Sequence, residues 1–292
     1  MLRGGELERE VYEAEHIRQV MAEIERNFPK YFQSFALQSP APWFTQAIED
    51  YESEREKYRA YLDLEALQEY DFDPNAFKTH TRNNCPIIRR CLLAQDEVMK
   101  AYKRSFADTR GSALLDAVRH IAEFGHDYAA AFDDDEHENA SSYGDLGLEA
   151  LNDEQRQCAG VIGYGIQSSL LHGLYGRCFA HRSQNAVWTL YFLSGRKSFE
   201  LLDGSEFLIA DAAHGTCEQN FFYPAELFGF YALWVHVLLE AACLDHKVVF
   251  DREYRYVYTS AFCDHVADRH REDINTLKWS SEHVESRPYF WR

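Results

Sequence analysis

Apolar residues recur every three or four positions along most of this chain, the spacing that places side chains on one face of an α-helix. Residues 6–28 show the pattern plainly, and Pro29 marks the predicted end of that helix. Its apolar stripe consists of Val11, Ala14, Ile17, Met21, Ile24 and Phe28. Similar segments cover 45–70, 84–106, 112–132, 184–194, 224–245 and 260–278. Asn84 and Ser183 are the predicted N-terminal caps of two of these helices. We predict a mainly α-helical, bundle-like globular protein with about seven or eight long helices.

One small β-structure interrupts the helical pattern. Residues 198–202 and 205–209 are two short runs separated by Asp203-Gly204. An Asp-Gly pair between two such runs is typical of a two-residue hairpin loop in a type I′ turn. The sequence therefore predicts a β-hairpin over about 198–209. Residues 248–258 are rich in β-branched and aromatic side chains and predict a third short strand.

The helical pattern breaks between Asp133 and Asp153. An acidic run opens this segment, and serines and glycines follow it. We predict an acidic N-terminal helical region over 1–132, a loop or linker over 133–152, and a C-terminal helical region with the hairpin over 153–292. The C-terminal half is also rich in apolar helices, so the two regions can equally pack as one domain.

The chain is acidic, with a formal net charge of −18 over 292 residues. Residues 1–150 contain 17 Lys and Arg against 30 Asp and Glu, giving −13, and residues 151–292 contain 13 against 18, giving −5. This field repels free nucleic acid and anionic membranes. A negative charge of this size is consistent with solubility alone or with binding of a basic protein partner.

The cysteines and the N-terminus predict a cytoplasmic protein. The seven cysteines are odd in number and none are spaced as a Cys-x-x-Cys pair, as expected of buried free thiols in a reducing compartment. The first ten residues are charged and lack a signal-like apolar stretch. The longest apolar run, 231–244, contains His236 and Glu240 and is short for a bilayer, so we predict a buried helix and no membrane association.

The known catalytic and cofactor-binding motifs do not identify an active site in this sequence. Two Glu-x-x-His pairs, at Glu13 with His16 and at Glu123 with His126, have the spacing found in di-iron helical bundles. Because Glu123 falls opposite the apolar face of its helix, the di-iron hypothesis is weak. The glycines of 160–165 do not form a phosphate-binding motif, and there is no Gly-x-Ser-x-Gly elbow. We therefore predict no cofactor and no metal site.

Polar side chains able to make directional contacts gather after residue 171. The candidate ligand-binding residues are His172, Arg177, His181, Arg182, Asn185 and Arg255. Burying such groups is costly unless they pair with one another or with a ligand. The simpler interpretation is a satisfied polar network, and the functional alternative is a pocket for an anionic or amide-bearing ligand.

Two functional hypotheses follow from these patterns. The first is a non-enzymatic intracellular protein that binds a basic protein partner, such as a regulatory protein or an immunity protein that neutralises a toxin. The alternative is an enzyme: a hydrolase or nuclease that uses the His, Arg and Asn side chains of 172–188 or, with weaker support, a di-iron carboxylate oxidase. Acidic charge and the lack of a recognisable catalytic motif favour the first.

The cysteine pattern predicts that the purified protein has no disulfide. Alkylation of the denatured, unreduced protein should label all seven thiols in intact-mass spectrometry. A species that takes up fewer labels until a reductant is added would show a native disulfide and contradict this prediction.

Overall fold

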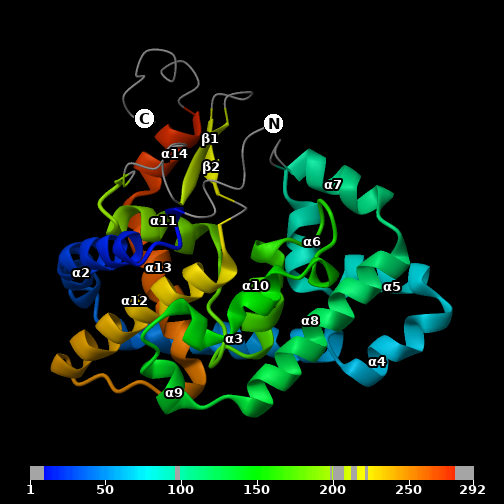
Figure 1. Ribbon diagram of the computed structural model, residues 1–292, viewed down its shortest axis with the longest axis horizontal. Coiled ribbons are helices and arrows are strands. Elements are labelled where there is room, and N and C mark those ends of the chain that lie inside the picture. The colour runs from blue at the N-terminus through cyan, green and yellow to red at the C-terminus, as the bar shows by residue number, and fades with distance from the viewer. Residues whose placement is uncertain are drawn as a thin grey trace.

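The computed structural model describes residues 10–95, 99–197, 199, 207–211, 216–220 and 223–279. Within these ranges the protein is mainly α-helical, which confirms the predicted fold class (Figure 1). The helices of the N-terminal part are α2 (Ala14–Ala36), α3 (Pro40–Tyr61), α4 (Leu64–Gln68), α5 (Pro74–Asn84), α6 (Pro86–Leu93), α7 (Met99–Asp108), α8 (Gly111–Ala131) and α9 (Asp134–Glu138). A 3-10 turn, η1 (Glu69–Phe72), follows α4.

The C-terminal part combines long helices with short 3-10 turns. The turns are η2 (Tyr143–Leu146), η3 (Leu148–Asn152), η4 (Glu154–Arg156) and η5 (Arg252–Tyr254). The helices are α10 (Tyr164–Leu174), α11 (Gln184–Leu193), α12 (Ala225–Asp245), α13 (Arg255–Arg269) and α14 (Arg271–Trp279). Two strands, β1 (Leu208–Asp211) and β2 (Thr216–Gln219), pair antiparallel.

The first helix does not end at Pro29, contrary to the prediction. Helix α2 continues through Pro29 to Ala36. A proline inside a helix removes one backbone hydrogen bond and costs about 3 kcal/mol. The apolar stripe continues beyond it with Phe32 and Phe35, both buried. Burial of these rings offsets the cost of the proline, so tertiary packing overrides the local stop signal.

Helix starts were predicted with mixed success. Ser183 caps α11 as expected, because its hydroxyl accepts a hydrogen bond from the Ala186 N–H at 3.1 Å. Asn84 is not the predicted cap: it is the last residue of α5, and Cys85 precedes Pro86 at the start of α6. A polar residue before a proline fits the end of one helix as well as the start of the next, so the local signal was ambiguous.

The predicted hairpin over 198–209 is not supported. Its proposed turn, 203–204, lies outside the described residues, and Leu208 and Ile209 pair instead with Gln219 and Glu218, downstream. The strand predicted over 248–258 is wrong, because this segment contains η5 and the start of α13. Its aromatic side chains Tyr256 and Tyr258 are buried on a helix, which shows that composition alone did not distinguish the two structures.

One apolar core includes side chains from both ends of the chain. Helix α3 packs against α10 and α13, and α2 packs against α11 and α12. The acidic segment predicted as a loop carries α9, η2 and η3, and the two turns pack on α12 through Leu146 and Leu148. The division into separate regions over 1–132 and 153–292 stays a prediction.

Helix α12 matches the helix predicted over 224–245, and the apolar run 231–244 lies within it. Its 21 residues are long and apolar enough to cross a bilayer by length and composition, a test that core helices of soluble proteins also pass. In this fold 61% of its most apolar window is buried against protein. Some of its apolar side chains nevertheless remain accessible, among them Leu244 at 56% exposure.

Close packing between α3 and α10 depends on a glycine. A Cβ placed on Gly173 would overlap the ring of Tyr58, whereas one placed on Gly165 in the same helix would meet only the Arg182 carbonyl oxygen at 4.0 Å. We expect Gly173→Ala to destabilise the protein by about 1–3 kcal/mol in urea unfolding. The matched Gly165→Ala should be neutral or stabilise by up to about 1 kcal/mol. Equal stability of the two variants would show that the helices separate without cost.

Candidate functional site

The most highly charged part of the interior joins α9 to α13. Arg255, the first residue of α13, has no exposed side-chain surface. Its Nη2 donates to Asp134 Oδ1 at 2.7 Å and to Glu138 Oε1 at 2.5 Å, and its Nη1 donates to the Arg177 carbonyl oxygen at 2.8 Å. A buried guanidinium is thus held by two carboxylates and one backbone carbonyl.

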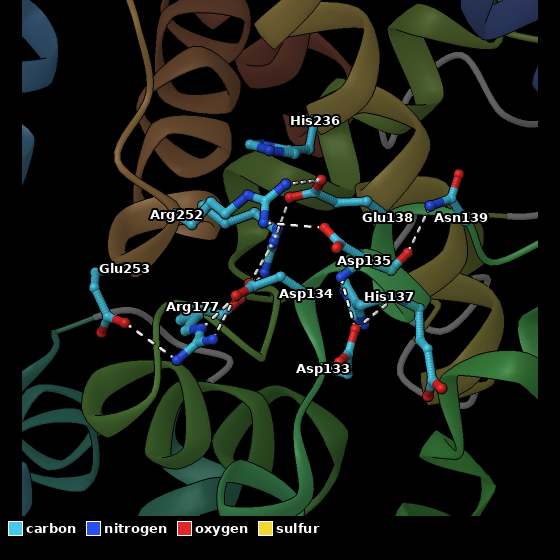
Figure 2. Close-up of polar contacts among 12 residues, drawn as sticks. Asp133, Asp134, Asp135, His137, Glu138, Asn139, Arg177, His236, Arg252 and Glu253 are labelled. Atoms are coloured by element: carbon cyan, nitrogen blue, oxygen red, sulfur yellow. Dashed lines mark hydrogen bonds and ion pairs between the residues drawn. The ribbon is translucent and has the colours of Figure 1, made fainter.

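Two further arginines complete this network, which Figure 2 shows around α9. Arg177 forms a bidentate ion pair with Asp134 and a second contact with Glu253, at 3.2 Å. Arg252 contacts Asp135 at 3.1 Å and Glu138 at 3.2 Å. The segment of α9 is therefore held against η5, α13 and the loop after α10.

Aromatic rings line the same network. The guanidinium carbons of Arg177 and Arg255 each lie 5.5 Å from the centre of the Phe132 ring. Hydrogen bonds from Arg177 and Arg255 lower the pKa of Asp134 from its ordinary value of 3.8 to about 2. His137 donates or accepts a 2.6 Å hydrogen bond with the Tyr256 hydroxyl, and burial lowers its pKa to about 3. At neutral pH the acid is charged and the imidazole is not.

His172 and His181, two of the candidate ligand-binding residues, lie together. Their rings stack with centres 5.0 Å apart and 7° between their planes. His172 Nδ1 lies 2.9 Å from the Phe179 carbonyl oxygen, so this nitrogen carries the proton. His181 Nε2 lies 3.1 Å from Ser169 Oγ. Burial lowers the pKa of His172 to about 4 and that of His181 to about 3, so both rings are neutral at physiological pH.

These histidines lack the partners that nucleophilic catalysis needs. Neither ring contacts a carboxylate among the contacts of the described residues, so no acid orients the imidazole beside Ser169. Cys178 is buried, and burial raises the pKa of its thiol to about 12, which keeps it protonated. A hydrolase or nuclease mechanism through this pair therefore receives little support from the geometry.

Arg182 and Asn185 lie in different surroundings. Arg182 is 5% exposed and donates to the Asn220 carbonyl oxygen, with its guanidinium over the rings of Tyr164 and Phe228. Its Nη1 is buried without a hydrogen-bond acceptor, and burial lowers its pKa to about 10, so it remains a cation. Asn185 donates to Asp264 Oδ1 at 2.7 Å.

The six predicted residues therefore divide into separate contact sets. Arg177 joins Arg255, His172 joins His181, and Arg182 and Asn185 each have partners of their own. Sequence reasoning missed the carboxylates that hold the arginines. Asp134 and Glu138 are four residues apart, the spacing that aligns two side chains on one helical turn, and this signal was available in the acidic run.

Metal-ligand geometry does not appear in the described part of the chain. No three His, Cys, Asp or Glu side chains there gather closely enough to hold a metal ion. Glu13 precedes α2 and is exposed, while His16 is buried with its ring edge-on to Phe199. The di-iron hypothesis gains no support from the two Glu-x-x-His pairs.

A surface feature that the sequence did not single out lies between α3 and α5. Residues 63–73, here called the acidic loop, contain five carboxylates and no Lys or Arg. Phe72 projects from this loop with 98% of its side chain exposed. Its carboxylates are Asp63, Glu65, Glu69, Asp71 and Asp73.

Short-range contacts fix the shape of the acidic loop. Asp63 accepts from the Ala66 N–H at 2.8 Å, and Asp73 accepts from the Ala76 N–H at 3.0 Å, so each caps a helix. Asp71 pairs with Arg119 of α8, and Leu67 is buried beneath the loop. Phe72 is therefore exposed on a well-anchored backbone.

Comparisons with known proteins add no functional information. Neither family models, nor curated proteins, nor solved structures gave a match to this chain.

The paired state of Asp134 predicts a loss of stability in acid. A carboxyl whose pKa is lower in the folded state stabilises the protein above its unfolded pKa, and this stabilisation is lost as the pH falls through the folded value. We expect Asp134→Asn to cost about 2 kcal/mol at pH 7, with the difference from the wild type shrinking between about pH 4 and pH 2.

Asp135→Asn is the matched control for this variant. Asp135 is 78% exposed and pairs with the half-exposed Arg252, so its loss should cost under about 1 kcal/mol. Urea unfolding across the pH range measures both. Equal effects of the two substitutions would contradict a structural role for the Asp134 pair.

Proposed function

We propose that this chain is a non-enzymatic acidic protein that binds a basic protein partner, as a regulatory protein or a toxin-neutralising immunity protein would. The observation that carries the proposal is Phe72, an almost fully exposed aromatic ring held among five carboxylates. Aromatic residues are enriched in protein interfaces, and a ring that stays in water in the free protein can be buried on binding. Burying a phenylalanine side chain is worth about 1.5–3 kcal/mol.

The charges of the acidic loop suit a cationic partner. Glu65 and Glu69 are exposed and form no ion pair with any residue that the structure describes. Asp71 already has a partner in Arg119, so the unpaired carboxylates provide most of the local field. Such a field speeds association with a basic surface and suppresses acidic partners.

The interior favours a binding role over catalysis. Arg177 and Arg255 are engaged by carboxylates, His172 is buried and His181 is half-buried, and desolvation keeps both imidazoles neutral. Side chains that already make contacts inside the protein are not free to bind a substrate. The enzyme alternative at 172–188 would need these side chains to leave the internal contacts that they make with protein groups.

We further propose that the protein acts in the cytoplasm. Six cysteines lie among the residues whose side chains are described, and all six are free thiols. Burial raises the pKa of Cys85 and Cys243 to about 12, so these thiols stay protonated and resist oxidation. Free, buried thiols suit a reducing compartment.

Removal of the Phe72 ring should weaken partner binding without harming the fold. The protein and its Phe72→Ala variant would be immobilised to capture partners from the cells that make it, and affinity for the captured protein would follow by calorimetry. We expect at least a tenfold loss for Phe72→Ala, about 1.4 kcal/mol, with an unchanged unfolding midpoint. Glu65→Lys should weaken binding chiefly at low salt.

Leu93→Ala is the control, since Leu93 is 61% exposed on α6, outside the acidic loop. It should leave affinity unchanged. Recovery of an acidic partner, equal affinity of the wild type and Phe72→Ala, or turnover of a nucleic acid that depends on His181 would each contradict the proposal.

A further inference from the structure

An open groove runs between α2 and α12, away from the acidic loop. It has a volume of about 580 Å³. Its walls are mostly apolar, with Phe28 and Phe32 from α2, Leu37 just after it, and Leu238, Ala241 and Ala242 from α12. Gln33, Asp245 and His246 are its polar lining residues.

Apolar side chains near the groove are exposed to water. Leu37, just after α2, is 84% exposed and lines the groove, and Leu244, on the last turn of α12, is 56% exposed. Helix α12 is mostly apolar around its circumference, with Glu240 among its few polar residues, a pattern expected of a helix that protein covers on most sides. On the groove side, however, Ala241 is exposed and Leu238 is half-buried. Exposed apolar side chains along a groove are typical of an interaction site.

An unpaired carboxylate lies at one end of the groove. Asp245, the last residue of α12, lines the groove, is exposed, and forms no ion pair within the described ranges. The C-terminus of a helix carries partial negative charge, so a carboxylate there is unfavourable in the free protein. Lys247 follows closely but does not pair with it. A cation from a partner would relieve both the carboxylate and the helix end.

The dimensions of the groove fit a short helix. Its lining residues run from Phe28 on α2 to Leu37, just after that helix, and from Leu238 on α12 to His246, just after that helix. At a rise of about 1.5 Å per residue these spans are roughly 12–14 Å long. Anchors at i, i+4 and i+7 of a bound helix span about 10.5 Å, which matches.

We propose that this groove binds an amphipathic helix of a partner protein, with its apolar face between α2 and α12 and a Lys or Arg against Asp245. This is a second surface, distinct from the acidic loop. In Figure 1, α4 lies toward one end of the long axis, and α2 and the end of α12 lie toward the other. The protein would then hold two partners, or two parts of one partner, at opposite ends.

The test uses a defined probe. A fluorescein-labelled helical peptide of about 15 residues would carry Leu at i, i+4 and i+7 and Lys beyond each end of that stripe. A matched peptide would carry Gln in place of Lys. Fluorescence anisotropy of the full-length protein with each peptide should show saturable binding, tighter for the Lys peptide.

Variants of exposed groove residues should remove this binding without unfolding the protein. We expect Leu37→Asp and Ala241→Arg to weaken both peptides at least tenfold. Asp245→Asn should weaken the Lys peptide about threefold and leave the Gln peptide unchanged. Val249→Asp, at a 79% exposed residue that does not line the groove, and Phe72→Ala, in the acidic loop, should bind as the wild type does.

Three results would overturn the proposal. One is equal peptide affinity of the wild type and Leu37→Asp. The second is self-association in sedimentation velocity that Ala241→Arg abolishes, because a second copy would then occupy the groove. The third is binding to zwitterionic lipid vesicles that Leu37→Asp abolishes, because a bilayer would then be the occupant. The groove and the acidic loop share no residue. If the Phe72→Ala prediction fails, the peptide-binding test of the groove therefore remains valid.

Discussion

The buried guanidinium of Arg255 is the constraint on which the surrounding structure depends. A cation with no exposed surface is stable only where carboxylates and carbonyls surround it, and here Asp134, Glu138 and the Arg177 backbone do so. Meeting this requirement fixes α9 against α13 and brings the loop after α10 to the same point. The acidic segment is thereby ordered by charge pairing as well as by apolar burial, and residues distant in sequence become neighbours.

The remaining polar groups of the interior follow the same logic of mutual satisfaction. Stacked His172 and His181 stay neutral because burial disfavours their charged forms, and His137 uses the Tyr256 hydroxyl. The high aromatic content makes this possible, since rings supply both apolar bulk and hydrogen-bonding tips. Arg182 stands apart, as a buried cation held by one carbonyl and two ring faces. His137, His172, His181 and Arg255 are engaged by protein groups, which moves attention to the surface.

The surface offers two places where exposed apolar side chains lie near carboxylates that have no ion-pair partner among the described residues. Phe72 on the acidic loop and the groove between α2 and α12 both combine exposed apolar side chains with unpaired carboxylates. Folding buries little of the apolar surface of Phe72 and Leu37, and both places would gain free energy when a cationic, partly apolar partner covers them. The acidic net charge is thus concentrated, in part, at places suited to binding.

The sequence by itself determined the helical class and the acidic character of this protein. Periodicity fixes which helix face is apolar, and charge is additive along a chain, so both can be read without a fold. Local signals also placed the Ser183 cap correctly. Tertiary structure alone decided that α2 passes through Pro29, that 252–258 is helical, and that Arg177 and Arg255 share carboxylates. Those outcomes depend on packing and pairing between residues far apart in the sequence, 121 positions for Asp134 with Arg255 and 227 for Phe35 with Phe262, which no local pattern encodes.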